Sequence, residues 1–223
     1  TCREALQEIV RARMEGQRVY GECLAQHLVI DDSVYYDPDP VKARAYVMSP
    51  PFRPKDHLRE LWRGLQSGNL QTTATDHCAF CNADKEKGKD DFSKIPNGTS
   101  GVEDRMSVLW DQGVETGKLT PNEFVRVTST NAARIFGLYP KKGAIQVGSD
   151  ADLAIVDMGL EKTVSPELFG TWSDYSLYTG VKLKGWPVFT MLRGRIVVAD
   201  GKANVEPGYG QFMPRPVEPL ATK

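Results

Sequence analysis

The sequence predicts an α/β fold in which helices connect parallel strands, and two observations carry this prediction. Residues 1–76 alternate between patterns typical of helices and of strands, in the order helix, strand, loop, strand, helix, strand. Three short parallel strands cannot close a barrel, so this part is either a piece of a larger barrel or a small open sheet. From residue 139 onward, strand-like runs separated by turns predict an all-β region.

Composition indicates a protein with an ordinary core and balanced charge. Of the 223 residues, 40% are hydrophobic, and 28 basic side chains stand against 29 acidic ones. No nucleic acid or membrane partner is therefore expected, and we expect a small molecule or another protein surface instead. No apolar run approaches the roughly 18 residues of a membrane helix, and the first residues show no secretory signal pattern. We expect a cytoplasmic protein whose four cysteines are reduced.

The first elements follow from capping residues, spacing and turn formers. Thr1 and Glu4 have the form of a capping box, which predicts a helix from residue 1 to Gly16 and suggests that the natural protein has residues upstream. Residues 18–22 and 45–49 are predicted strands, and the segment between them is predicted to be a loop.

An amphipathic helix and a buried strand are predicted next. The apolar residues Leu58, Leu61, Trp62 and Leu65 share one helical face, and Gly68 ends that helix. Residues 70–75 are a strand rich in β-branched side chains.

The later elements include a long loop, two helices and several strands. Residues 77–100 are predicted to be a polar, mostly solvated loop whose Pro-Asn-Gly turn at 96–98 is functional. Capping boxes at Ser100 and at Thr120 predict two helices. Further predictions are strands at 145–147, 153–156 and 188–192, turns at 193–194 and 200–201, and an extended tail over 203–223 that orders against a neighbouring subunit.

Asp76 is the residue to which the sequence assigns the chemistry. It follows the predicted strand 70–75, and a carboxylate at the carboxyl end of a barrel strand can bind a divalent metal and move a proton. Its alternative role is that of a loop cap. His27, His57 and His77 have no metal-binding spacing and are predicted to be structural or at the surface, and the same is predicted for Cys78 and Cys81.

Six motifs occur in order along the chain, and together they resemble the C-terminal half of a D-hydantoinase or dihydropyrimidinase of the cyclic-amidohydrolase superfamily. They are residues 49–51 (SPP), 75–78 (TDHC), 87–98 (KGKDDFSKIPNG), 103–108 (EDRMSV), 128–133 (TSTNAA) and 148–153 (GSDADL).

The resemblance implies a fold and its boundaries. It implies the C-terminal part of a TIM-like (β/α)8 barrel over residues 1–138 and part of a β-sandwich subdomain over 139–204. Residues 205–223 are expected to be an extended tail that contacts a neighbouring subunit. In that family two zinc ions are bridged by a carboxylated lysine and a hydroxide, which attacks a ring amide carbonyl. The tetramer is the assembly that the resemblance favours.

The resemblance also implies roles for three residues. The position matching Asp76 binds zinc and carries the proton to the leaving ring nitrogen, and main-chain groups matching Ser49 and Asn97 hold the ring amide of a cyclic ureide or imide. The other metal ligands of the family, four histidines and the lysine, have no counterparts here. We therefore expect an N-terminal half of the same protein to supply them, and the 223-residue chain to be inactive alone.

Two non-enzymatic interpretations are also compatible with the sequence. One is a non-enzymatic scaffold of the collapsin response mediator type, which shares many of these motifs but does not keep the acid found here as Asp76. The other is a short protein that uses its sheet for subunit contact only.

Overall fold

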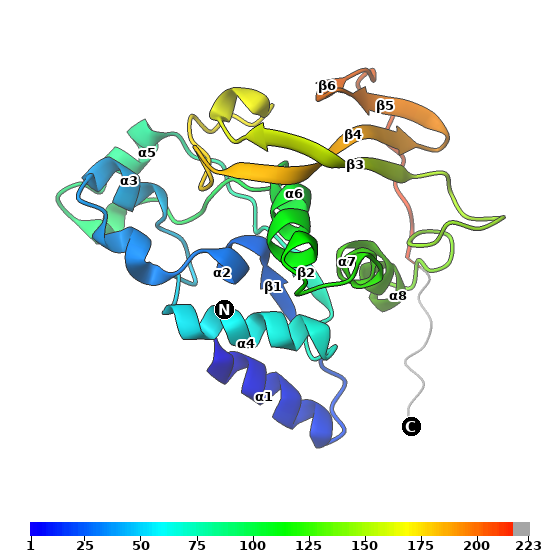
Figure 1. Ribbon diagram of the computed structural model, residues 1–223, viewed down its shortest axis with the longest axis horizontal. Helices are drawn as coiled ribbons and strands as arrows, with labels where there is room; N and C mark the ends of the chain where they lie inside the picture. Colours follow the sequence, from blue (N-terminus) through cyan, green and yellow to red (C-terminus); the bar gives the residue numbers. More distant parts are fainter. Residues whose placement is uncertain (216–223) are drawn as a thin grey trace.

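A computed structural model describes residues 1–215 (Figure 1). Two helices lie on one side of a short parallel sheet, and on the other side α6 (Arg105–Leu109) packs between the parallel part and an antiparallel sheet. The parallel strands are β1 (Glu22–Leu24) and β2 (Thr72–Ala74), paired from Glu22 with Thr72 to Leu24 with Ala74. Beyond β2, an isolated parallel bridge pairs His77 with Thr99, which belongs to a third segment. α4 (Lys55–Gln66) covers the strands, and α1 (Arg3–Met14) lies outside α4.

The predicted amphipathic helix is confirmed as α4. Leu58, Leu61, Trp62 and Leu65 are all buried, and the last three belong to the first core cluster. The Trp62 indole N–H donates to the Leu28 carbonyl at 2.9 Å. Burying side chains of this size contributes about 1.5 to 3 kcal/mol each. Gly68 follows the helix with φ 75°, as expected of a residue just after a helix end.

The segment predicted as a loop is largely helical, and the predicted strand at 45–49 is wrong. α2 (Ala25–Val29), the 3-10 turn η1 (Asp32–Tyr36) and α3 (Pro40–Ala45) fill it. Asp39 accepts from the Val41 N–H at 2.9 Å with Pro40 at the first helical position, so local capping outweighs the strand preference of Tyr46 and Val47.

Two other N-terminal boundaries also differ from prediction. α1 begins at Arg3 after Cys2, without a side-chain cap, so the predicted box at Thr1 does not form. The strand predicted over 18–22 begins only at Glu22.

The predicted helix at Ser100 starts later, because its capping residues are used elsewhere. Ser100 Oγ contacts the Tyr175 carbonyl at 3.4 Å, and the Glu103 carboxylate accepts from the Gly170 N–H at 3.0 Å. α6 (Arg105–Leu109) therefore follows Asp104 and runs into the π-helical stretch η3 (Trp110–Glu115). The polar loop before it contains α5 (Asn82–Glu86) and η2 (Phe92–Lys94).

The predicted capping box at Thr120 is confirmed, with both of its hydrogen bonds present. It opens α7 (Pro121–Val125), which continues through the π-helical stretch η4 (Arg126–Thr130) into α8 (Asn131–Ile135). Gly137, with φ 70°, comes just after this run.

The all-β region is an antiparallel sheet in the order β3 (Leu153–Thr163), β4 (Lys182–Leu192), β5 (Arg195–Ala199) and β6 (Lys202–Ala203), with η5 (Pro166–Leu168) between β3 and β4. The predicted turns at 193–194 and 200–201 are confirmed by positive φ at both residues of each. Residues 145–147 form no strand, and Val147 is fully exposed.

A second core cluster joins β4 to the parallel half of the molecule. It contains Met48, Phe52, Val108 and Trp186, among others. Residues 204–215 form no helix or strand, and the rest of the predicted tail, 216–223, lies outside the described residues.

Candidate active site at the end of the parallel strands

Asp76 lies just beyond β2 with an exposed side chain and φ 48°, a left-handed conformation that Asp adopts more readily than most residues. The backbone before it is held by two long side chains. Arg105 Nη1 donates to the Thr73 carbonyl at 2.8 Å, and Gln26 Nε2 donates to the Thr75 carbonyl at 2.7 Å. The carboxylate therefore projects from a fixed strand end.

The Pro-Asn-Gly turn runs beside this strand end. The Cys78 N–H donates to the Thr99 carbonyl at 2.9 Å, in line with the bridge between His77 and Thr99. A Cβ atom at Gly98 would lie 2.6 Å from the Cβ of Cys78, and Gly98 has φ 137°, so only glycine fits there. The close approach places Asn97 near the end of β2.

Ser49 and Asn97 meet across this turn. Ser49 Oγ donates to Asn97 Oδ1 at 3.0 Å, and the Gly98 N–H donates to the Val47 carbonyl at 3.2 Å. Both side chains are exposed. Within residues 1–215, no hydrogen bond engages the main-chain N–H or C=O of Ser49 or Asn97. Two donors and two acceptors of the backbone therefore have no partner at this spot within the described residues.

His27 contacts the backbone next to Ser49 from inside the molecule. It is 3% exposed, and its Nε2 lies 3.1 Å from the Pro50 carbonyl. Burial lowers the pKa of His27 to about 4, so the ring is neutral at pH 7 and Nε2 donates to that carbonyl. The predicted structural role of His27 fits this position.

The other predicted structural residues also contact the backbone. His77 Nδ1 accepts from the Gly101 N–H at 3.2 Å, and His57 Nδ1 accepts from the Arg3 N–H at 3.1 Å. All four cysteines are free thiols, and Cys81 Sγ lies 3.2 Å from the Trp172 carbonyl oxygen.

The sequence prediction missed Lys85, which was assigned to a solvated loop. Its side chain is 1% exposed, and its Nζ donates to the carbonyls of Val47, Pro96 and Gly98 at 2.7, 2.6 and 2.7 Å. No sequence signal marked it, because α5 has only five residues and shows no amphipathic repeat.

No metal centre is complete within the described part of the chain. Among residues 1–215, no group of three or more His, Cys, Asp or Glu side chains could hold an ion. The residues present therefore do not fit a two-metal site by themselves, and Asp76 is the single ligand that the sequence predicted here.

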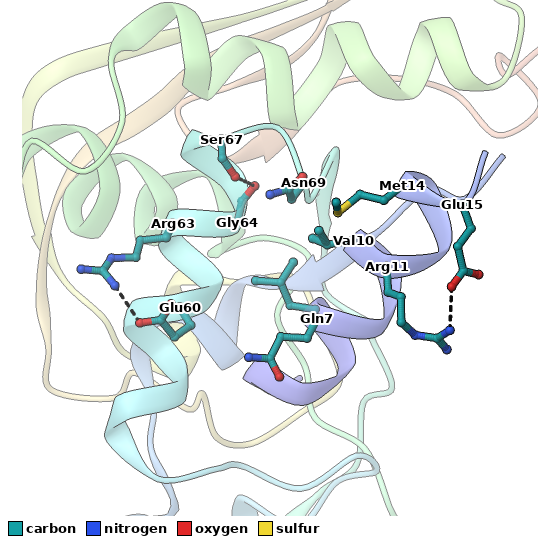
Figure 2. A pocket seen from close by; sticks show the side chains of 11 residues that line it. Gln7, Val10, Arg11, Met14, Glu15, Glu60, Arg63, Gly64, Ser67 and Asn69 are labelled. Carbon is teal, nitrogen blue, oxygen red and sulfur yellow. Dashed lines mark hydrogen bonds and ion pairs between the residues drawn. The ribbon is translucent and has the colours of Figure 1, made fainter. Parts of the chain in front are cut away.

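A groove of about 620 Å³ lies elsewhere, between α1 and α4 (Figure 2). Leu6, Val10 and Gly64 are among the residues that line it. Figure 2 shows the ion pairs of Arg11 with Glu15 and of Arg63 with Glu60, which also belong to the lining. Asp76, Ser49 and Asn97 do not line it.

The profile of the family described as "Amidohydrolase family" matches residues 6–197. The chain belongs to the amidohydrolase family, and the predicted resemblance within it is confirmed. The chain is 44% identical over 216 residues to a D-hydantoinase of Geobacillus stearothermophilus, covering 96% of this chain and 46% of that protein. It is 45% identical over 214 residues to a dihydropyrimidinase of Rattus norvegicus, covering 96% and 41%.

Solved structures give the same result for the fold. One described as "Crystal structure of D-hydantoinase" matches with a TM-score of 0.93 at 45% identity, covering 97% of this chain and 47% of that one. An L-hydantoinase (dihydropyrimidinase) from Arthrobacter aurescens matches with a TM-score of 0.86 at 35% identity, covering 95% and 46%. The predicted α/β fold with part of a TIM-like barrel is confirmed, and the chain spans about half the length of these relatives. No helix in residues 1–215 is long and apolar enough to cross a membrane.

Proposed function

We propose that the whole protein containing this chain is a zinc-dependent cyclic amidohydrolase that opens the ring amide of hydantoins or dihydropyrimidines. The observation that carries this proposal is the strand end of β2, where Asp76 lies beside the Ser49 and Asn97 turns, in a chain 44% identical to a D-hydantoinase. The relatives reported above carry names of hydrolases, which favours an enzyme over the scaffold alternative.

The roles proposed for the three residues follow from their exposed groups. The main-chain N–H groups of Ser49 and Asn97, which have no partner within residues 1–215, donate to ring carbonyl oxygens, and the C=O groups of the same residues accept from ring N–H. Asp76 is proposed to bind metal and to carry a proton at its carboxylate to the ring nitrogen that leaves. Bound zinc supplies a nucleophile at neutral pH, and its remaining ligands come from the other half of the protein.

Several broader assignments belong to the same proposal. Residues 1–138 form the C-terminal part of the barrel, residues 139–204 part of a β-sandwich, and residues 205–223 a tail that contacts another subunit. The assembly is a homotetramer. The cytoplasm is the proposed compartment, since the four thiols are unpaired.

The test compares the full-length protein with its Asp76→Asn variant. Wild type is expected to open hydantoin or dihydrouracil, and the variant to lose about a thousandfold in kcat, within the range for a lost general acid-base group. Ring opening is followed by loss of ring absorbance and by mass spectrometry of the product. Asp90→Asn is the control, because Asp90 is an exposed carboxylate in the loop that follows. An Asp76→Asn enzyme as active as the control would contradict the proposal.

A further inference from the structure

Lys85 is a buried cation that contacts only main-chain oxygens at hydrogen-bond distance. Its three N–H donors point to three carbonyls at 2.6 to 2.7 Å, so its donor capacity is fully used. No carboxylate in residues 1–215 forms an ion pair with it. The Phe80 ring lies 5.4 Å from Nζ and adds a cation–π contact.

Burying a charge in this way is costly, so the arrangement requires compensation. Burial lowers the pKa of Lys85 to about 8, which still leaves the ammonium group largely protonated at pH 7. Three convergent carbonyl dipoles offset part of the desolvation cost. If this position only had to fill space in the loop, an apolar side chain would do so without the desolvation free energy of a buried charge.

The identity of the three carbonyls gives the reason for the arrangement. Val47 lies two residues before Ser49, and Pro96 and Gly98 lie on either side of Asn97. One ammonium group therefore joins the two turns on their buried side. The same turns contain Ser49 and Asn97, which are exposed and whose main-chain groups have no partner within residues 1–215. The side chains of these two residues are 3.0 Å apart.

We propose that Lys85 is a positioning residue that sets the spacing between the Ser49 and Asn97 backbones, and so the fit of the cyclic imide between them. For its ligand this inference rests on the proposed function. A ring with alternating C=O and N–H groups needs donors and acceptors at fixed separation, and Lys85 fixes them without touching the ring.

The experiment compares full-length wild type, Lys85→Met and Lys85→Gln with hydantoin and dihydrouracil as substrates. Lys85→Met removes all donors and is expected to raise KM at least tenfold, with kcat within about threefold and metal content unchanged. Lys85→Gln keeps amide donors and is expected to give a smaller rise in KM. If Lys85→Met does not fold, Lys85→Gln decides the question by the same comparison.

A matched control separates positioning from general stabilisation. Lys118 also donates to a main-chain carbonyl, that of Gln112 at 2.8 Å, but none of its contacts involves the candidate site. Lys118→Met is expected to leave KM unchanged. A KM that stays unchanged in the Lys85 variants would overturn the proposal. So would a joint loss of kcat, bound metal and thermal stability that is not accompanied by a selective rise in KM.

Amide hydrogen exchange keeps this inference distinct from the proposed function. In Lys85→Met, peptides covering residues 46–50 and 95–99 are expected to exchange faster, while peptides from α4 keep the wild-type rate. If wild type opens neither ring, the proposed function fails. Hydrogen exchange then tests the positioning role of Lys85 by itself. If Lys85→Met and wild type exchange at the same rate in both of these turns, the positioning role is refuted.

Discussion

At the scale of single residues, the candidate site combines buried donors with exposed functional groups. Gln26, His27 and Lys85 are buried, Arg105 is half-buried, and each donates a side-chain N–H to a main-chain carbonyl near the ends of the parallel strands. Asp76 and its partners at 49 and 97 remain exposed. The buried donors shape the backbone, because a buried carbonyl left without a partner costs about 1 to 3 kcal/mol.

Replacing the side chains at 49 and 97 is expected to matter little, because the groups proposed to bind the ring belong to the main chain. Ser49→Ala and Asn97→Ala each lose the 3.0 Å side-chain contact, and KM is expected to change by about threefold or less. Steady-state kinetics of both variants test this. A tenfold rise in KM for either would show that the side chain itself contacts substrate.

Asp104 is expected to make stability depend on pH. It is 3% exposed, accepts from Ser176 Oγ at 3.1 Å, and has a pKa raised by burial from 3.8 to about 6. Because the pKa is higher in the folded state, protonation of Asp104 favours folding, and this effect is complete below pH 3.8. The contribution of about 3 kcal/mol is lost as the pH rises through about 6.

Asp104→Asn tests this dependence. The variant is expected to be more stable than wild type by about 2 kcal/mol at pH 8 and to show little gain at pH 4. Urea unfolding of both proteins at the two values measures the difference, with Asp90→Asn as the exposed control. A gain that is the same at both values would contradict the assignment.

At the scale of elements, the contact between β4 and the helical run from α6 into η3 joins the two halves of the chain. Gly185 on β4 has φ 83°, and a Cβ atom there would lie 2.1 Å from Trp110. Next to it, the Lys184 N–H donates to Asp111 at 2.9 Å, and the Lys184 ammonium pairs with Glu115 at 2.7 Å. Trp110 can pack against the strand because position 185 has no side chain.

Gly185→Ala is therefore expected to destabilise the protein by about 3 kcal/mol. The left-handed backbone costs about 1 to 2 kcal/mol for a residue with a Cβ, and the collision with Trp110 adds an overpacking cost of similar size. Gly117→Ala is the matched control, since Gly117 has φ 72° but open space around it. Chemical unfolding of both variants isolates the cost of the collision with Trp110. Equal losses of unfolding free energy in the two variants would refute that cost.

At the scale of the whole molecule, residues 1–215 form two core clusters but only part of a site. One cluster lies around Leu61 and Leu109, the other around Phe52 and Trp186, and Figure 1 shows the parallel strands between α4 and the antiparallel sheet. The chain spans less than half the length of the D-hydantoinase relative from Geobacillus stearothermophilus. The proposed metal site needs ligands that residues 1–215 do not bring together.

The 223-residue chain alone is therefore expected to be inactive and to bind zinc only weakly. Its single predicted ligand, Asp76, is an exposed carboxylate without a second donor set around it. Metal analysis and a ring-opening assay on the purified chain, beside the full-length protein, test this. Ring opening by the chain with two bound zinc ions would contradict it.

Prediction from sequence succeeded where local signals agree with tertiary packing. The helical face of Leu58, Leu61, Trp62 and Leu65, the box at Thr120 and the turns at 193–194 and 200–201 were all confirmed. It failed where a residue with a local signal forms a hydrogen bond to a distant part of the chain instead. Ser100 and Glu103 form no cap because Tyr175 and Gly170 engage them, and residues 46–49 form no strand.

The sequence by itself determined the family, the α/β class and the position of Asp76 at the end of a strand. Each follows from residue order and local spacing, which can be recognised in the sequence alone. Only the tertiary structure decided that Ser49 meets Asn97 and that Lys85 holds both turns from beneath. Those facts depend on contacts between residues 11 to 48 positions apart, which hydrophobic periodicity does not encode.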